Sequence, residues 1–105
     1  MSGKTRKQQI EEMLADDPND PFLRYGLAME HISLGEDEAA VRCFQDLLAV
    51  APNYVPAFMQ ISQALIRLGR LAEARSQLSR GIAVARQQGN EHAAEEMQGF
   101  LAGLE

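Results

Sequence analysis

The chain has 105 residues, of which 46% are apolar and 24% charged, and its formal net charge is −5. This length is typical of one domain, and the composition excludes a wholly disordered chain. No apolar run approaches a membrane span, no apolar segment follows the basic N-terminus as in a secretory signal, and the single Cys43 excludes an internal disulfide, so we expect a cytoplasmic protein.

The first predicted helix covers residues 4–16, where apolar side chains recur on one face. A second helix follows Asp20, a favourable N-cap with Pro21 at the first helical position. Gly35 ends it, because a helix C-terminus favours a residue of positive φ. A third helix is predicted over residues 37–50, after which a proline stops it.

The second half of the chain repeats this order. A helix over residues 55–68 ends at Gly69, and a longer one covers residues 71–88. The last predicted helix covers residues 91–103, with Asn90 as its N-cap. Alanine, leucine, glutamine, glutamate and arginine dominate the composition, which favours a nearly all-α protein.

Charge is distributed unevenly along these elements. Residues 10–54 carry two arginines against ten acids, whereas residues 55–90 carry five arginines against one glutamate. Opposite blocks of this kind could favour head-to-tail association or select a charged partner. Two solvated helix faces are the simpler interpretation.

The chain matches itself when it is shifted by 34 residues. The matching pairs are Pro18 with Pro52, Asn19 with Asn53, Leu34 with Leu68, Gly35 with Gly69, Ala40 with Ala74 and Ala51 with Ala85. Glycine, proline and alanine report backbone geometry and close packing, so the agreement indicates a structural repeat. It predicts a half-repeat at residues 1–19, full repeats at 20–53 and 54–90, and a capping helix at 91–105.

This pattern resembles the tetratricopeptide repeat (TPR) family, whose unit is a 34-residue helix–turn–helix. The motif residues are Ala28, Gly35, Ala40, Phe44 and Pro52 in the first unit, and Ser62, Gly69, Ala74 and Leu78 in the second. The resemblance implies a single all-α domain of about six helices. Its antiparallel helix–turn–helix repeats would stack as a short right-handed α-solenoid.

Some positions depart from the family pattern. Arg24 stands where the family often has an aromatic residue, His31 where it often has tyrosine, and Asp37 where a bulky residue is usual. Arg86 replaces the exit proline of the second unit, so we expect the helix there to run long before it ends near Gly89.

No catalytic motif is found. Glu36, Asp37 and Glu38 lack the alternating spacing of a calcium loop and are typical of the first turn of a helix. His31 and Cys43 together supply too few ligands to indicate a metal site. With no phosphate-binding loop, nucleophile elbow or zinc spacing, we expect no enzyme activity, cofactor or metal.

Two classes of ligand are also excluded by the sequence. The arginines of the second unit are spread around its helices without aromatic stacking platforms, so we expect no nucleic-acid binding. A chaperone-binding subclass of the resembling family grips a peptide carboxylate with Lys, Asn and Arg. The matching positions here are Tyr25, Met29 and Gln60, so that clamp is absent.

The resemblance implies a non-catalytic protein–protein interaction or scaffold module, because the first helices of TPR units line a concave groove that binds a peptide or helix. The residues mapped to this groove are Phe22, Tyr25, Met29, Ile32, Tyr54, Met59, Gln63, Ile66 and Arg67. Two alternatives stay open. The same face could join two copies as a homodimer or a larger assembly. Alternatively, the closing helix could fold across the groove and cover it with its residues Met97 to Leu104.

Overall fold

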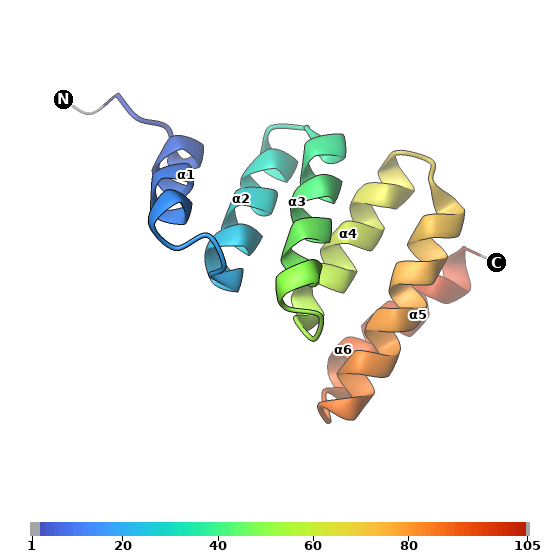
Figure 1. The fold of residues 1–105 in the computed structure, drawn as a ribbon. Coiled ribbons are helices and arrows are strands. Elements are labelled where there is room, and N and C mark those ends of the chain that lie inside the picture. The colour runs from blue at the N-terminus through green and yellow to red at the C-terminus, as the bar shows by residue number, and fades with distance from the viewer. Residues whose placement is uncertain (1–2, 105) are drawn as a thin grey trace. The chain divides into compact units, whose positions relative to one another are not determined.

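The computed structural model describes residues 3–104 and contains no strand within them. Its helices are α1 (Arg6–Asp16), α2 (Pro21–Ser33), α3 (Asp37–Val50), α4 (Val55–Arg67), α5 (Leu71–Gln87) and α6 (Glu91–Gly103). The chain forms two compact units, an N-terminal unit up to Pro52 that contains α1–α3 and a C-terminal unit from Asn53 that contains α4–α6. Within each unit successive helices run antiparallel (Figure 1). The predicted all-α fold of helical repeats is confirmed.

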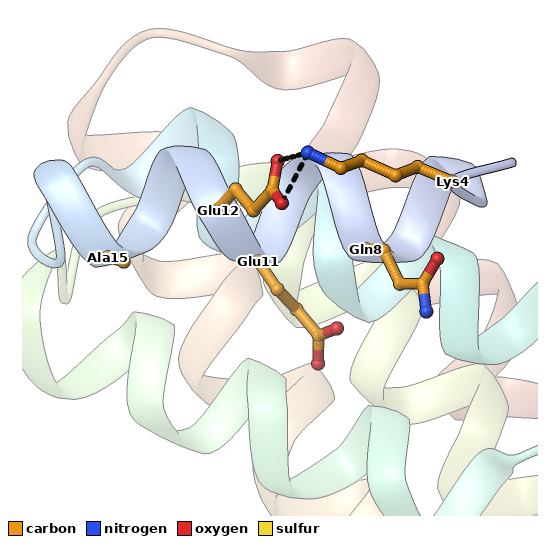
Figure 2. A pocket seen from close by; sticks show the side chains of 5 residues that line it. All are labelled: Lys4, Gln8, Glu11, Glu12 and Ala15. Atoms are coloured by element: carbon orange, nitrogen blue, oxygen red, sulfur yellow. Dashed lines mark hydrogen bonds and ion pairs between the residues drawn. The ribbon is translucent and has the colours of Figure 1, made fainter. Parts of the chain in front are cut away.

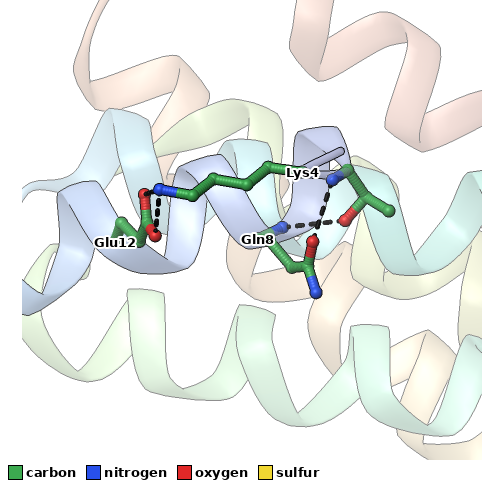
Figure 3. Close-up of polar contacts among 4 residues, drawn as sticks. Lys4, Gln8 and Glu12 are labelled. Carbon is green, nitrogen blue, oxygen red and sulfur yellow. Dashed lines mark hydrogen bonds and ion pairs between the residues drawn. The ribbon is translucent and has the colours of Figure 1, made fainter. Parts of the chain in front are cut away.

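Side-chain caps fix where α1 and α2 begin. The Asp20 carboxylate accepts hydrogen bonds from the backbone N–H groups of Phe22 and Leu23, at 2.9 and 3.2 Å, as its predicted N-cap role requires. The first helix starts two residues later than predicted, because Thr5 and Gln8 form a reciprocal capping box. Figure 3 shows the polar contacts of Gln8 beside the Lys4–Glu12 ion pair.

Glycines end three of the helices in the same way. Gly35 has a φ of 75°, and its N–H donates to the Ile32 carbonyl while the Glu36 N–H donates to the His31 carbonyl. This is the Schellman arrangement, which satisfies carbonyls that the helix leaves open. Gly69 and Gly89 repeat it with φ values of 76° and 73°. The predicted turn glycines are therefore confirmed, and α5 runs longer than α3 as expected.

Replacing Gly35 with valine should destabilise the protein by roughly 2 kcal/mol, because β-branched residues strongly resist positive φ. A Cβ atom at Gly35 would meet nothing within 4 Å, so backbone strain alone would cause the loss. The midpoint of thermal unfolding, followed by circular dichroism, measures it. Gly35→Asn is the control, since asparagine tolerates this conformation better. Equal melting of the two variants would contradict the explanation.

Small residues allow the helices of each unit to approach closely. Ala28 of α2 and Ala40 of α3 are fully buried, and Phe44 of α3 fills the space beside them. In the C-terminal unit, Ser62 and Ala74 play the same part, and the Ser62 hydroxyl donates to the Phe58 carbonyl at 2.6 Å. The hydroxyl is thus satisfied by its own helix, which makes its burial tolerable.

Candidate functional site

An apolar hollow of about 380 Å³ lies between α1 and α2 of the N-terminal unit, and we name it the α1–α2 hollow. Three predicted groove residues, Phe22, Tyr25 and Met29, line it from α2. The remaining lining residues are Arg6, Gln9, Ile10 and Met13 of α1 and Leu23, Gly26 and Glu30 of α2. The contribution of α1 was not predicted, since only the first helices of the repeats were mapped to the groove.

The hollow has a buried floor and an exposed apolar rim. Ile10 is buried, and its Cδ1 atom lies 3.6 Å from where a Cβ of Gly26 would stand. Phe22 is 73% exposed and Met13 is 52% exposed, so two large apolar side chains face solvent. Tyr25 is held in place because its ring packs against Phe44 with 6.0 Å between centroids. The floor is therefore buried and packed, while the rim leaves apolar surface uncovered.

Charges border this apolar surface without filling it. The Arg6 guanidinium lies 3.7 Å from the Glu30 carboxylate, and the arginine side chain is 74% exposed. An ion pair this exposed contributes little to stability. Asp16 is the last residue of α1, three positions after Met13, and Asp17 is the C-cap that follows it. Two exposed carboxylates therefore stand at the C-terminal end of α1, the helix that forms one wall of the hollow.

A second hollow of about 380 Å³ lies between α4 and α6 of the C-terminal unit. Gln63, Ile66 and Arg67 line it from α4, and all three were predicted groove residues. The side from α6 is formed by Gly99, Phe100, Gly103 and Leu104. The end of α6 thus approaches these α4 residues but leaves a space between, and Phe100 stays 40% exposed.

The other predicted groove residues lie outside both hollows. Ile32, Tyr54 and Met59 are half-buried and line neither of them. The nine predicted residues therefore fall into one set of three in each unit and three that belong to neither hollow. The α1 side was missed, although Met13 stands 34 positions before the core residue Leu47 and could have been recognised from the repeat.

A third, shallow hollow of about 400 Å³ runs along α1 itself, lined by Lys4, Gln8, Glu11, Glu12 and Ala15 (Figure 2). Its Lys4 ammonium pairs with the Glu12 carboxylate at 2.7 Å. The lining residues come from one helix and its N-terminal flank and are all exposed, so this surface is a solvated helix face. Lys4 and Arg6 of the basic N-terminus thus pair with Glu12 and Glu30.

His31 and Cys43 were weighed in the sequence as possible metal ligands, and in the structure each has a role in packing or in a turn. His31 Nδ1 lies 2.8 Å from the Glu36 carboxylate, which ties the last turn of α2 to the following loop. Burial raises the pKa of the Cys43 thiol, and the nearby Asp46 carboxylate adds to the effect, so the reactive thiolate is disfavoured. Among residues 3–104, no three His, Cys, Asp or Glu side chains gather as metal ligands would. No helix of this part of the chain is long and apolar enough to cross a bilayer.

Known proteins share this arrangement. Residues 23–54 match the tetratricopeptide repeat, and the chain is 31% identical over 96 residues to a TPR repeat-containing protein of Pseudomonas aeruginosa, covering 91% of each. The solution structure of a tetratricopeptide repeat domain protein from Salinibacter ruber is 33% identical, with a TM-score of 0.79 and 84% and 89% of the two chains covered. A protein of Bordetella parapertussis reaches a TM-score of 0.83 at 27% identity, with 96% and 88% covered.

Proposed function

Because the chain belongs to the tetratricopeptide repeat family, whose repeats generally serve as protein–protein interaction modules, we propose that it is a non-catalytic scaffold that binds a partner protein through the α1–α2 hollow. The observation that carries the proposal is the uncovered apolar rim. Phe22 and Met13 are the most exposed large apolar side chains beside a cavity in the N-terminal unit. A contiguous exposed apolar patch of this kind is typical of a partner site.

The chemistry of the lining suits a protein ligand. Tyr25 and Phe22 offer aromatic surface, and aromatic residues are enriched where interfaces gain most of their binding energy. Met13 and Met29 add flexible side chains that adapt to the shape of a partner. Gln9 supplies a polar group at the edge, as the rim of an interface requires.

Self-association is the second candidate function. The acidic block at residues 10–54 and the basic block at residues 55–90 are complementary, so one copy could present its C-terminal unit to the N-terminal unit of another. Sedimentation velocity over a wide concentration range tests this. A concentration-dependent dimer that Met13→Glu disrupts would favour it over a separate partner, whereas a monomer throughout would remove it.

The double substitution Phe22→Ala with Met29→Ala should abolish capture of the partner from an extract of the native cell, because it removes apolar surface from both ends of the hollow. We expect at least a tenfold loss of affinity once the partner is purified, equivalent to about 1.4 kcal/mol. The measurement is affinity capture with mass spectrometry, followed by titration calorimetry.

The control is Leu34→Ala with Leu71→Ala, which removes two exposed apolar side chains outside the hollow. This variant should capture the same proteins as the unmodified chain. Circular dichroism melting of both variants verifies that they fold. Partners that survive the Phe22–Met29 change in a folded protein would place the binding site elsewhere.

A further inference from the structure

The α1–α2 pair of the N-terminal unit has an internal counterpart in the α5–α6 pair of the C-terminal unit. Shifting by two repeats, each of 34 residues, superposes the lining positions in pairs. The pairs are Ile10 with Leu78, Met13 with Gly81, Gly26 with Ala94 and Met29 with Met97. Both pairs of helices thus place equivalent residues on the surface that they share.

In the C-terminal unit this surface is covered by a third helix. Leu78, Gly81, Ala94 and Met97 are all buried. A Cβ on Gly81 would stand 2.6 Å from the Cβ of Phe58 and 2.6 Å from the sulfur of Met97. Phe58 belongs to α4, so α4 inserts its aromatic anchor at the position where α5 and α6 meet.

In the N-terminal unit no helix of the described residues covers the equivalent surface. Met13 is 52% exposed where its counterpart Gly81 is buried, and the space above it is the α1–α2 hollow. We propose that this hollow is a seat for one amphipathic helix of the partner protein, which binds there as α4 lies on α5 and α6. The inference rests on the proposed function and names the form of the partner.

The packing of α4 indicates what the incoming helix must carry. Its buried apolar residues include Val55, Phe58 and Leu65, spaced along one face by three and seven residues. Met13 stands where Gly81 admits Phe58, so the incoming helix would lie farther from α1 than α4 lies from α5. The Phe58 equivalent would then rest against the side chains of Met13 and Met29. A helix with one bulky anchor, an apolar residue one turn before it and another two turns after it therefore fits the seat.

The internal counterpart also gives the direction of the incoming helix. The Gln88 side chain donates a hydrogen bond of 2.6 Å to the carbonyl of Asn53, so the start of α4 lies at the end of α5. By equivalence, the start of the incoming helix lies at the end of α1, beside Asp16 and Asp17. Lysine or arginine just before the helix would complement these carboxylates, so the partner segment is basic at that end.

A second position also differs between the two helix pairs in a way that limits binding. Arg6 occupies the position of Ala74, which is fully buried against its neighbours in the C-terminal unit. The long arginine side chain holds an incoming helix away from this end of α1. Shortening it should therefore improve the seat, which is an effect that a purely structural role for Arg6 does not produce.

The test uses a synthetic peptide of residues 53–67 preceded by two lysines, with both ends blocked. A side-chain staple on its solvent face keeps it helical, because an isolated helix of this length is marginal in water. The full chain is labelled with ¹³C on the methionine methyl groups and titrated in an NMR experiment. Met13 and Met29 report on the hollow, whereas Met59 and Met97 report on the C-terminal unit.

We expect the methyl signals of Met13 and Met29 to shift and those of Met59 and Met97 to stay in place. Met13→Glu should weaken binding at least tenfold, and Arg6→Ala should tighten it several-fold. Asp16→Asn with Asp17→Asn should weaken binding in dilute salt and lose that effect at high salt. Leu71→Glu, an exposed position of the C-terminal unit, should leave binding unchanged.

The negative control is the same peptide with Phe58→Asp. If this peptide bound as tightly as the unmodified peptide, the inference would be overturned. Shifts confined to Met59 and Met97 would also overturn it, because they would mean that the peptide displaces α4 instead. If the helical peptide fails to bind while the Phe22–Met29 variant still loses its cellular partner, the helical seat is wrong and the proposed function stands.

Discussion

Replacing Phe44 with alanine is expected to lower the free energy of unfolding by about 3–5 kcal/mol. Phe44 is fully buried, and its ring meets Tyr25 of α2 at an interplanar angle of 59°. Truncation removes the apolar area, leaves a cavity between α2 and α3, and ends the aromatic contact. Since small domains are stable by only about 5–15 kcal/mol, this loss is a large fraction of the total.

Chemical denaturation followed by circular dichroism measures the loss. Phe22→Ala removes the same ring from a side chain that is 73% exposed, so it should change stability by no more than about 0.5 kcal/mol. The pair separates burial from aromatic character. An unchanged denaturation midpoint for Phe44→Ala would mean that Phe44 does not face α2, and the repeat register derived from the sequence would fail with it.

The register of the 34-residue repeat was predictable, because the residues that start and end helices act through their own backbone and nearest neighbours. Asp20 with Pro21 starts α2, and Gly35 ends it through its own positive φ, so no distant contact is needed to locate the helix. The third helix was predicted over 37–50 and is observed as Asp37–Val50 for the same reason. The start of the first helix was also readable, because Thr5 and Gln8 have the Thr-x-x-Gln spacing of a capping box, and that local signal rather than the apolar face marks where α1 begins.

Two residues that depart from the family pattern, Arg24 and His31, form side-chain contacts that the sequence does not reveal. The Arg24 Nε group donates a hydrogen bond of 2.7 Å to the Pro18 carbonyl, so this side chain braces the loop before α2. His31 pairs with Glu36 across the turn that ends α2. Both interactions depend on rotamers and on loop geometry, which a 34-residue pattern does not specify.

The candidate site was predicted in part. Phe22, Tyr25 and Met29 are apolar residues that the repeat core does not need, and they line one hollow. The opposite wall, which includes Met13, comes from the half-repeat helix, whose exposure depends on whether another helix covers it. Sequence periodicity places Met13 on a core face, but it does not say whether that face is occupied.

Gly81 shows how tertiary packing can reverse a local preference, and replacing it with alanine should destabilise the protein by about 1–2 kcal/mol. In an exposed helix the same change would stabilise by up to about 1 kcal/mol. Here the new Cβ would lie 2.6 Å from the Cβ of Phe58, which is fixed to the α4 backbone and cannot swing away. Overpacking of this kind costs about 1–3 kcal/mol, so crowding outweighs propensity.

The effect should grow with side-chain size. Gly81→Leu restores the residue type found 34 positions earlier at Leu47 and should cost about 3 kcal/mol or more, because α4 and α6 both have to shift. Thermal denaturation of the series gives the order. Gly99→Ala is the matched control, since Gly99 is also helical but its Cβ would meet nothing within 4 Å, and it should raise the melting temperature.

A double-mutant cycle identifies the colliding groups. Met97→Ala removes the sulfur that would lie 2.6 Å from the new Cβ, so Gly81→Ala should cost less in that background than in the unmodified chain. Purely additive effects would mean that the clash with Phe58 accounts for the whole loss. If Gly81→Ala instead stabilised the protein as Gly99→Ala does, α4 would not lie against α5 and α6 at this point, and the helical seat inferred for the α1–α2 hollow would lose its template.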